Sequence, residues 1–485
     1  MSFCGVKLSA IRQHLTKLSG GDLCRALAVA GLVLYAVCIL VSNPSGQSTA
    51  FLNSLIFRRQ GRYLYTNTDI NDLVFGIASS ASTWRTRRQY IEGWWQPNIT
   101  RGYVFFDVPP PKEYMPWSPF SPPYRVSENI SRFKDFNKHA MPFAVRMVRV
   151  IKETFLEVPK GVKWYVMADD DTVLFIDNLV EILSKYDHNE YYYIGCNSEA
   201  VGSNADHSFR MAFGGAGYAL SYPLAKALAR NLDDCIKRYP NLYGSDLILQ
   251  SCISDLGVSL TLEPGFHQID LHGDISGFLS AHPQTPIISL HHLDYTNPLY
   301  PAMNVFQSLK LFMNVSRVDS SRLLQQSICY QKKNNWTFSI SWGYSALIYE
   351  NIFPPSNLER PLQTFVPWRN VYKPPAFMFN TRWVTKNPCE TPHFFFLDSV
   401  EQKPGGYEIV TNYGRKWDRR LPACSSTGNH SADWISQIRV ISPAKRYVGG
   451  EGKRRECCDI ARIYGGSNIT EIRLRSCMED EIIIV

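Results

Sequence analysis

Three consecutive acidic side chains are the strongest chemical signal in this 485-residue sequence. Asp169, Asp170 and Asp171 directly follow the apolar run 164–168, which has the composition of a buried strand. In an open α/β sheet, ligands bind beyond the carboxyl ends of the strands. Adjacent carboxylates raise one another's pKa unless a cation neutralises them, and oxygen ligands suit Mg²⁺ or Mn²⁺, which also bind substrate phosphates. The triplet therefore indicates either a metal-bound diphosphate site or a solvated acidic turn.

Two reactions fit an acidic triplet at the end of a strand. One is transfer of a sugar from a nucleotide-sugar whose diphosphate binds the metal. The other is phosphate transfer through an aspartate nucleophile, because residues 169–173 also match the D-x-D-x-T/V pattern that resembles haloacid-dehalogenase-like phosphatases. Those enzymes carry this pattern on the first strand of their domain. Here a long α/β stretch precedes it, which favours the nucleotide-sugar reaction.

Three downstream segments carry further candidate residues. The small residues Gly214, Gly215, Ala216 and Gly217 predict either a backbone that approaches a ligand closely or a tight turn. Asp246, after Gly244 and Ser245, begins a helix, where an aspartate is either a cap or a catalytic base. His267 follows the strand-like run 259–262 and is either structural or a ligand.

The elements around these residues alternate between strands and helices. Apolar runs predict strands at 73–78, 103–106, 163–168 and 191–195, whereas helical spacing covers 85–95, 141–157, 176–186 and 247–256. Such alternation favours an α/β fold with a parallel sheet and right-handed crossovers.

The remaining sequence predicts a stepwise domain organisation. After about residue 304 the pattern changes to short aromatic runs broken by proline, which we interpret as a mostly β accessory domain. The predicted parts are a cytosolic tail (1–25), a transmembrane signal anchor (26–41), a stem (42–69), the α/β domain (70–304), connecting helices (305–326) and the aromatic-rich, disulfide-containing accessory domain (327–485).

The first 41 residues determine the expected compartment. Four basic residues and one acid precede the apolar run 26–41, which is a short membrane span, with a cleaved signal peptide as the alternative. Because positive charge stays cytosolic, the chain beyond residue 41 is expected in the lumen, as in a single-pass type II protein of the Golgi membrane.

Glycosylation signals and cysteines agree with a lumenal location. Six Asn-X-Ser/Thr tripeptides begin beyond the apolar run, at Asn98, Asn129, Asn314, Asn335, Asn429 and Asn468. Nine cysteines also lie there, so an oxidising lumen would pair most of them and leave at least one unpaired. The sequence contains no C-x-x-C pair, so the cysteine spacing does not indicate a zinc site.

The charge distribution argues against nucleic acid as a partner. The net charge is +8 and the pI is about 8.8, but no dense block of lysine and arginine occurs apart from the short run 453–455.

Taken in order, these segments resemble the fringe and core-1 galactosyltransferase group of inverting β-1,3-glycosyltransferases. The run 75–80, Trp84, Arg87 and residues 291–294 are most similar to the plant fringe-related branch. The resemblance covers about residues 73–304, and the aromatic C-terminal region is also similar to that branch. Relatives commonly have two acidic residues before the catalytic helix, whereas this sequence has Ser245-Asp246 at that position.

The resemblance implies a GT-A fold, which is a Rossmann-like nucleotide-sugar domain, and a role for each candidate residue. Asp169 and Asp170 would lie near the ribose and sugar of a UDP-sugar. Asp171 would bind Mn²⁺ or Mg²⁺, with His267 as a second ligand and His272 as the reserve, and Asp246 would be the general base. The nucleotide pocket would include Ser79, Ser80, Arg87 (with Arg85 and Arg88 as competitors) and the segment 214–217.

The expected function is therefore metal-dependent transfer of a sugar from a UDP-sugar to a hydroxyl of a glycan or glycoprotein, with inversion and a β-1,3 linkage. Two alternatives stay open at this stage: an aspartate-nucleophile phosphohydrolase, and a non-catalytic membrane protein that binds glycans through aromatic side chains.

Overall fold

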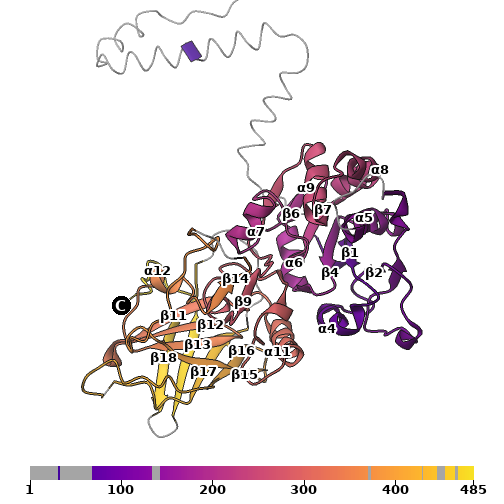
Figure 1. The fold of residues 1–485 in the computed structure, drawn as a ribbon. Helices are drawn as coiled ribbons and strands as arrows, with labels where there is room; N and C mark the ends of the chain where they lie inside the picture. Colours follow the sequence, from indigo (N-terminus) through magenta and orange to yellow (C-terminus); the bar gives the residue numbers. More distant parts are fainter. Residues whose placement is uncertain are drawn as a thin grey trace, which may run out of the picture. The chain divides into compact units, whose positions relative to one another are not determined.

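The computed structural model describes residues 31–32, 68–133, 142–369, 373–428, 430–444, 454–464 and 468–484. The chain divides into two compact units, residues 1–64 and 65–485, and the fold below is that of the second unit (Figure 1). The predicted tail, anchor and stem lie outside the described residues, apart from 31–32 and 68–69. Among the residues described, no helix has both the length and the apolar character needed to cross a membrane.

The first half of the folded unit is built on a seven-stranded sheet. Its strand order is β3-β2-β1-β4-β7-β6-β8, and all neighbours are parallel except β7, which is antiparallel to both β4 and β6. The strands are β1 (Leu73–Ala78), β2 (Gly102–Phe106), β3 (Tyr124–Val126), β4 (Trp164–Asp169), β6 (Tyr193–Gly195), β7 (Tyr218–Ser221) and β8 (Leu260–Leu262). The sheet is thus mixed within an α/β fold, which corrects the prediction of a parallel sheet.

Helices cover both faces of this sheet. One face packs on α5, α8 and α9 through a separate hydrophobic cluster. The other face packs on α4 and α6 and continues into the C-terminal half. The helices are α4 (Trp84–Trp94), α5 (Pro142–Glu157), α6 (Ile176–Leu183), α7 (Val201–Asp206), α8 (Tyr222–Arg238), α9 (Ser245–Asp255), α10 (Ser276–Leu279), α11 (Val305–Val318) and α12 (Pro355–Leu358). The predicted connecting helices at 305–326 are represented by the single helix α11.

The strand directions explain why candidate residues meet at one edge. The parallel strands β1, β2 and β4 end together, since Ala78 pairs with both Phe105 and Asp169. The antiparallel strand β7 brings its amino end to the same edge, because Met167 of β4 pairs with Tyr218. The segment 214–217 therefore arrives beside the acidic triplet.

The C-terminal half is an eight-stranded sheet of order β11-β12-β13-β15-β16-β17-β19-β18, antiparallel except between β17 and β19. The strands are β11 (Gln326–Gln331), β12 (Trp336–Ser341), β13 (Ser345–Tyr349), β15 (His393–Gln402), β16 (Glu408–Arg415), β17 (Gln437–Pro443), β18 (Cys457–Tyr464) and β19 (Ile469–Arg475). Two-stranded ladders also form between β5 (Val173–Leu174) and β10 (Ser289–Leu290), and between β9 (Leu271–Gly273) and β14 (Phe365–Pro367).

Four disulfides pair eight of the nine cysteines beyond the predicted anchor and leave Cys196 free, as predicted. The pairs are Cys235–Cys252, Cys329–Cys458, Cys389–Cys424 and Cys457–Cys477. The second pair joins β11 to β18, which are the two edge strands of the eight-stranded sheet.

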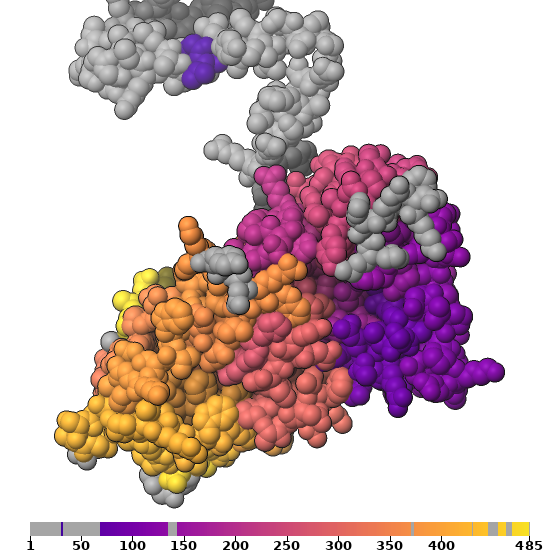
Figure 2. All heavy atoms as spheres, in the orientation of Figure 1, coloured from indigo at the N-terminus to yellow at the C-terminus, as the bar shows by residue number. Residues whose placement is uncertain are grey.

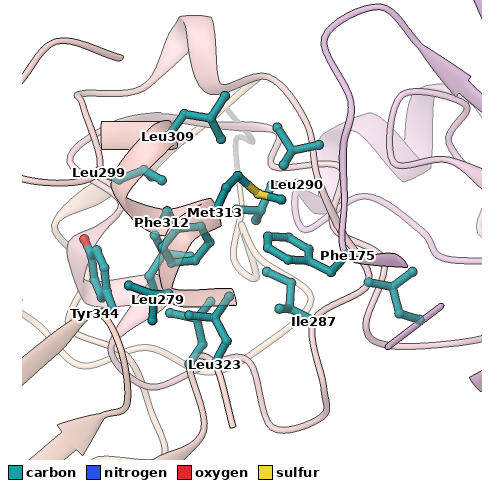
Figure 3. Close-up of a cluster of buried hydrophobic side chains, with 14 of the residues drawn as sticks. Phe175, Leu279, Ile287, Leu290, Leu299, Leu309, Phe312, Met313, Leu323 and Tyr344 are labelled. Carbon is teal, nitrogen blue, oxygen red and sulfur yellow. The ribbon is translucent and has the colours of Figure 1, made fainter. Parts of the chain in front are cut away.

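The two halves share one hydrophobic core. A single cluster of buried side chains extends from β1 to β19, and Figure 3 shows the part where Phe175 lies beside Phe312 and Met313, with Tyr344 on the other side of Phe312. In the space-filling view the C-terminal half lies directly against the first half, which contains the seven-stranded sheet (Figure 2). The C-terminal half is therefore packed as part of the same folded unit.

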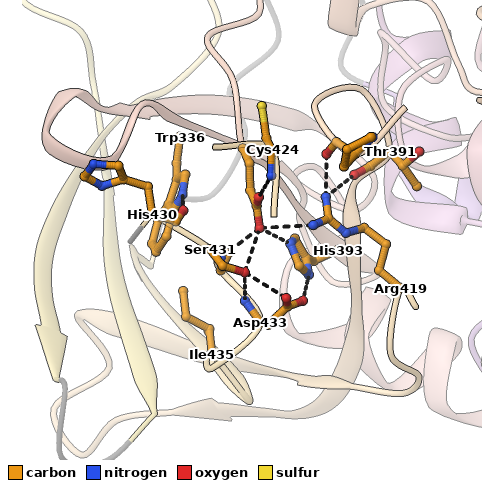
Figure 4. Close-up of polar contacts among 12 residues, drawn as sticks. Trp336, Thr391, His393, Arg419, Cys424, His430, Ser431, Asp433 and Ile435 are labelled. Atoms are coloured by element: carbon orange, nitrogen blue, oxygen red, sulfur yellow. Dashed lines mark hydrogen bonds and ion pairs between the residues drawn. The ribbon is translucent and has the colours of Figure 1, made fainter. Parts of the chain in front are cut away.

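A buried carboxylate organises the loops of the C-terminal half (Figure 4). Glu350 is 5 % exposed and accepts hydrogen bonds from His393 (2.8 Å), Arg419 (3.2 Å), and the backbone N–H groups of Cys424 (2.7 Å) and Ala432 (2.9 Å). Burial alone would raise the pKa of Glu350, but these donors outweigh it and lower that pKa to about 2. The donors already neutralise the carboxylate, so this group is structural rather than metal-binding.

We expect Glu350→Gln to lower the free energy of unfolding at pH 7 by about 3 kcal/mol, because a pKa lowered from 4.5 to about 2 is worth that much. The wild-type contribution is present above about pH 4.5 and is lost as the pH falls toward 2, so the difference between variant and wild type shrinks on acidification. Urea unfolding at pH 7 and pH 3 measures both values. Glu401→Gln, an exposed change on β15, is the control and should shift stability by less than about 0.5 kcal/mol.

Candidate active site

Asp170 is fully occupied by contacts within the protein. Its carboxylate accepts hydrogen bonds from Ser79 Oγ (2.8 Å), Thr83 Oγ1 (2.7 Å) and Arg87 Nη1 (2.8 Å). Arg87 also reaches Asp171 at 3.1 Å, and its two competitors Arg85 and Arg88 are exposed. The start of α4 therefore holds the acidic triplet in place, and Arg87 is the arginine that faces the site.

Asp169 and Asp171 converge with a histidine that the sequence analysis did not assign. Nε2 of His291 lies 3.1 Å from Oδ1 of Asp171, and ligating atoms of Asp169, Asp171 and His291 all lie within 4.8 Å of one another. We call these three residues the metal cluster. Asp171 and His291 are buried, and Asp169 is half-buried at the end of β4.

The groups of the metal cluster shift one another's pKa values strongly. Burial, together with the nearby carboxylates of Asp171 and Asp246, raises the pKa of Asp169 to about 7 against the opposing effect of His291. Burial would also raise the pKa of Asp171, but His291 and Arg87 hold it well below its usual range. For His291, burial acts to lower the pKa, but Asp171 and Asp169 raise it to about 9.

The metal cluster fits a divalent cation. Two carboxylates and one imidazole are a donor set that suits Mn²⁺, and the carboxylate of Asp169 has no hydrogen-bond donor to its oxygens among the described residues. A cation would stabilise the ionised form of Asp169, whose pKa is raised by burial and by the neighbouring carboxylates. Asp169, Asp171 and His291 are therefore the residues that would hold it.

His291 reaches the metal cluster through a short ladder that no local pattern predicts. Strand β5 follows the acidic triplet directly, and β10 precedes His291, so the pairing of Val173 with Leu290 places the two segments together. Each strand has only two residues. The His291-His292 pair was visible in the sequence, but its partner lies 120 positions away.

The prediction that His267 is a metal ligand is not supported by its position. Its Nδ1 contacts Oε1 of Glu199 at 2.9 Å, and its ring packs on Phe278 and His282. His272, the reserve candidate, stacks on Trp368 instead. Neither histidine is among the residues whose ligating atoms converge on Asp171.

Asp246 lies next to the metal cluster, in the first turn of α9. Asp246, Asp169 and Gly214 line the same small cavity of about 20 Å³. Burial raises the pKa of Asp246, although hydrogen bonds from the Gly214 backbone and from Ser245 oppose the shift. A carboxylate with a raised pKa is a better proton acceptor, so this position suits a general base.

The small residues 214–217 make room for the site's side chains. A Cβ on Gly214 would clash with the carboxylate of Asp246, and one on Gly215 would overlap the imidazole of His291. The N–H of Ala216 donates to Gln268 at 2.8 Å, and Gly217 has a φ of +81° in the turn before β7. The space beside this segment, which we predicted for a ligand, is thus filled by Asp246 and His291.

We expect Gly215→Ala to weaken Mn²⁺ binding at least ~tenfold, because the new methyl group must push His291 out of the metal cluster. Isothermal titration calorimetry measures the Kd. Gly93→Ala is the matched control: the nearest atom to its new Cβ is 3.9 Å away, so Mn²⁺ affinity should stay within about twofold of wild type. Equal Mn²⁺ affinities of the two variants would contradict the steric clash with His291.

Two further contacts at this edge were missed by the sequence analysis. Ser80 donates to Asp107 (3.2 Å), which follows β2 and also accepts from the N–H of Ala81. Asp294 accepts a short hydrogen bond from Tyr90 and lies 4.0 Å from Nε of Arg87. Long-range pairing creates both contacts, so neither Asp107 nor Asp294 stands out in the sequence.

Comparison with known proteins agrees with this architecture. Residues 68–298 match the family model described as "Fringe-like", and residues 203–458 match the model described as "Protein of unknown function, DUF604". The first match covers just under half of the chain, and it includes the seven-stranded sheet and the residues of the metal cluster. Because the second match spans just over half of the chain, the chain belongs to the DUF604 family.

Individual relatives match a smaller region. A beta-1,3-glucosyltransferase of Mus musculus is 33% identical over 108 residues, which is 22% of this chain and 21% of that protein. The Homo sapiens protein of the same name is 34% identical over 106 residues, covering 22% and 20%. The Danio rerio beta-1,3-N-acetylglucosaminyltransferase lunatic fringe is 32% identical over 135 residues, covering 23% and 33%. The match therefore spans about a fifth of the first two relatives.

A solved glycosyltransferase involved in glycosylation of the major capsid of PBCV-1 covers 50% of this chain and 98% of its own, at 10% identity and a TM-score of 0.27.

Proposed function

We propose that this protein transfers a sugar from a UDP-sugar to a hydroxyl of a glycan or glycoprotein, with inversion and a β-1,3 linkage. The observation that carries the proposal is the convergence of Asp169, Asp171 and His291 beside Asp246 at the carboxyl edge of a fringe-like sheet. The names of the relatives, which are β-1,3-transferases of glucose and of N-acetylglucosamine, support the reaction class.

Each residue has a defined part in such a reaction. Asp246 accepts the proton of the acceptor hydroxyl as that oxygen attacks the anomeric carbon, so no enzyme nucleophile is needed. Asp169, Asp171 and His291 are the residues that would hold a divalent cation, and such a cation would supply positive charge for the departing diphosphate. Arg87, through Asp170 and Asp171, keeps the carboxylates at fixed positions. Alignment of donor and acceptor contributes up to ~7–11 kcal/mol in favourable cases.

The proposal includes a location. The basic tail and apolar run at the amino terminus support a single-pass type II protein of the Golgi membrane with the folded unit in the lumen. Four disulfides in that unit are consistent with an oxidising compartment.

Incubating the full chain with a panel of UDP-sugars, with and without Mn²⁺, tests the proposal. Released UDP and the linkage in the product, determined by NMR, are the readouts. The expected result is Mn²⁺-dependent UDP release for at least one donor. Release of phosphate from p-nitrophenyl phosphate without any sugar transfer would favour the phosphohydrolase alternative, and glycan binding without turnover would favour the lectin-like alternative.

A further inference from the structure

The C-terminal half contributes a strand beside the metal cluster. Strand β14 pairs antiparallel with β9 of the fringe-like half, with Val366 opposite His272 (Figure 1). The next residue but one, Trp368, donates its backbone N–H to the carbonyl of Asp270 at 2.9 Å. Trp368 lies beyond the fringe-like residues 68–298 in the sequence, but the ladder places it against them in the structure.

Trp368 joins three other rings in what we call the aromatic corner: His272, His292, Tyr295 and Trp368. The indole stacks with the imidazoles of His292 (4.4 Å, 5°) and His272 (4.5 Å, 14°), and Tyr295 meets it edge-on (4.7 Å, 75°).

The aromatic corner is directly connected to the metal cluster. The ring of His292 lies 3.8 Å from that of His291, and its Nδ1 contacts Asp270 at 3.0 Å. His292 has a φ of +56°, a left-handed conformation that is costly for a histidine and persists only where surrounding contacts hold it. Asp270 and Trp368 supply those contacts. The aromatic corner and the metal cluster therefore form adjacent parts of one site.

The aromatic corner has free polar groups as well as an accessible ring. Tyr295 is 48 % exposed, and His272 and Trp368 are half-buried. Among the residues that the structure describes, no hydrogen-bond partner is present for the Tyr295 hydroxyl, the Trp368 indole N–H or the imidazole nitrogens of His272. Tyrosine and tryptophan combine an apolar ring with a polar group. An exposed ring beside unpartnered donors and acceptors matches the CH face and the hydroxyl groups of a sugar.

We propose that the aromatic corner is the acceptor subsite, in which a neutral sugar ring packs its CH face on Tyr295 and hydrogen-bonds the free polar groups around it. The inference rests on the proposed function, which requires a sugar hydroxyl close to Asp246 and the metal cluster. The carboxylates of Asp270 and Asp294 disfavour an acidic sugar at this position. The subsite also gives the C-terminal half a direct role in substrate binding, through Trp368.

Saturation-transfer NMR on the full chain, with UDP and Mn²⁺ present, tests the proposal. The probes are the methyl glycosides of galactose, glucose, mannose and fucose, with methyl glucuronide as the acidic comparison. At least one neutral glycoside should bind, and methyl glucuronide should bind more weakly. Tyr295→Ala should raise the Kd of the bound glycoside about tenfold through loss of the stacking ring. Tyr295→Phe and Trp368→Phe, which keep a ring, should raise it only about threefold.

Two measurements separate the possible outcomes. In Tyr295→Ala, the Kd values for Mn²⁺ and UDP should stay within about twofold of wild type. Tyr407 is an 84 % exposed tyrosine in the hairpin between β15 and β16, and Tyr407→Ala should leave the Kd values for the glycoside, Mn²⁺ and UDP unchanged. Binding of Mn²⁺ and UDP without binding of any glycoside, or with glycoside binding insensitive to Tyr295→Ala, would overturn the subsite alone. Failure of the wild-type protein to bind Mn²⁺ and UDP would overturn the proposed function, and the subsite with it.

Discussion

Asp171→Asn is expected to lower metal-dependent sugar transfer by at least ~1,000-fold, the largest loss among single substitutions in this protein. A cation held by the metal cluster would stabilise charge on the departing diphosphate by several kcal/mol, and each 1.36 kcal/mol corresponds to tenfold in rate. Asp171 is the acid that contacts both His291 and Arg87, so its loss removes one ligand and releases the other. The rate of UDP release and the Mn²⁺ Kd measure the effect.

The protonation of His291 distinguishes a lost ligand from a damaged fold. Because Asp171 is the main cause of the raised pKa of His291, that pKa should fall from about 9 to below its ordinary value of 6.5 in Asp171→Asn. NMR titration of the imidazole in metal-free protein measures the change. Asp177→Asn, on the exposed side of α6, is the matched control and should leave both values unchanged. Wild-type Mn²⁺ affinity in Asp171→Asn would show that Asp171 is not a metal ligand.

Asp246→Asn is expected to lower kcat about 10²–10⁴-fold, the range typical for loss of a general base. Asparagine has nearly the same shape and can keep the contacts with Ser245 and Gly214. The Kd values for UDP and Mn²⁺ should therefore stay within about twofold of wild type. Steady-state kinetics together with calorimetric titrations separate the two effects.

The pH dependence provides a second readout for Asp246. A general base acts only when deprotonated, so wild-type activity should be present above its pKa and lost as the pH falls through it. Burial raises this pKa above that of an exposed aspartate, which moves the loss of activity to higher pH. In Asp246→Asn that dependence should disappear from the residual activity. Asp255→Asn, at the other end of α9, should keep the wild-type profile, and a loss of UDP binding in Asp246→Asn would instead indicate a structural cap.

Residues whose role depends on one element were predictable from the sequence. Asp171 follows the buried strand β4, and Asp246 lies in the first turn of α9; both elements are recognisable from apolar runs and helix-start signals. Arg87 was assigned to the nucleotide pocket through the family resemblance, and its contacts with Asp170 and Asp171 place it at that edge. Local pattern was sufficient to place Asp171 and Asp246.

Residues whose role depends on long-range pairing were not predictable. The strand β7 was missed because it is short and follows a segment of small residues, so the sheet was expected to be parallel. His291 reaches Asp171 through a ladder of two residues per strand, and Trp368 reaches His292 through one of three. Such ladders leave no periodic signal, and the family resemblance had implied His267 as the ligand instead.

The disulfide between Cys329 and Cys458 has a consequence for the behaviour of the protein outside an oxidising environment. Edge strands present unpaired amide and carbonyl groups that can recruit a strand from a neighbouring molecule. With β11 and β18 covalently attached to each other, neither is free to do so. Exposure to reductants would release both at once, and the foreseeable result is self-association into larger particles.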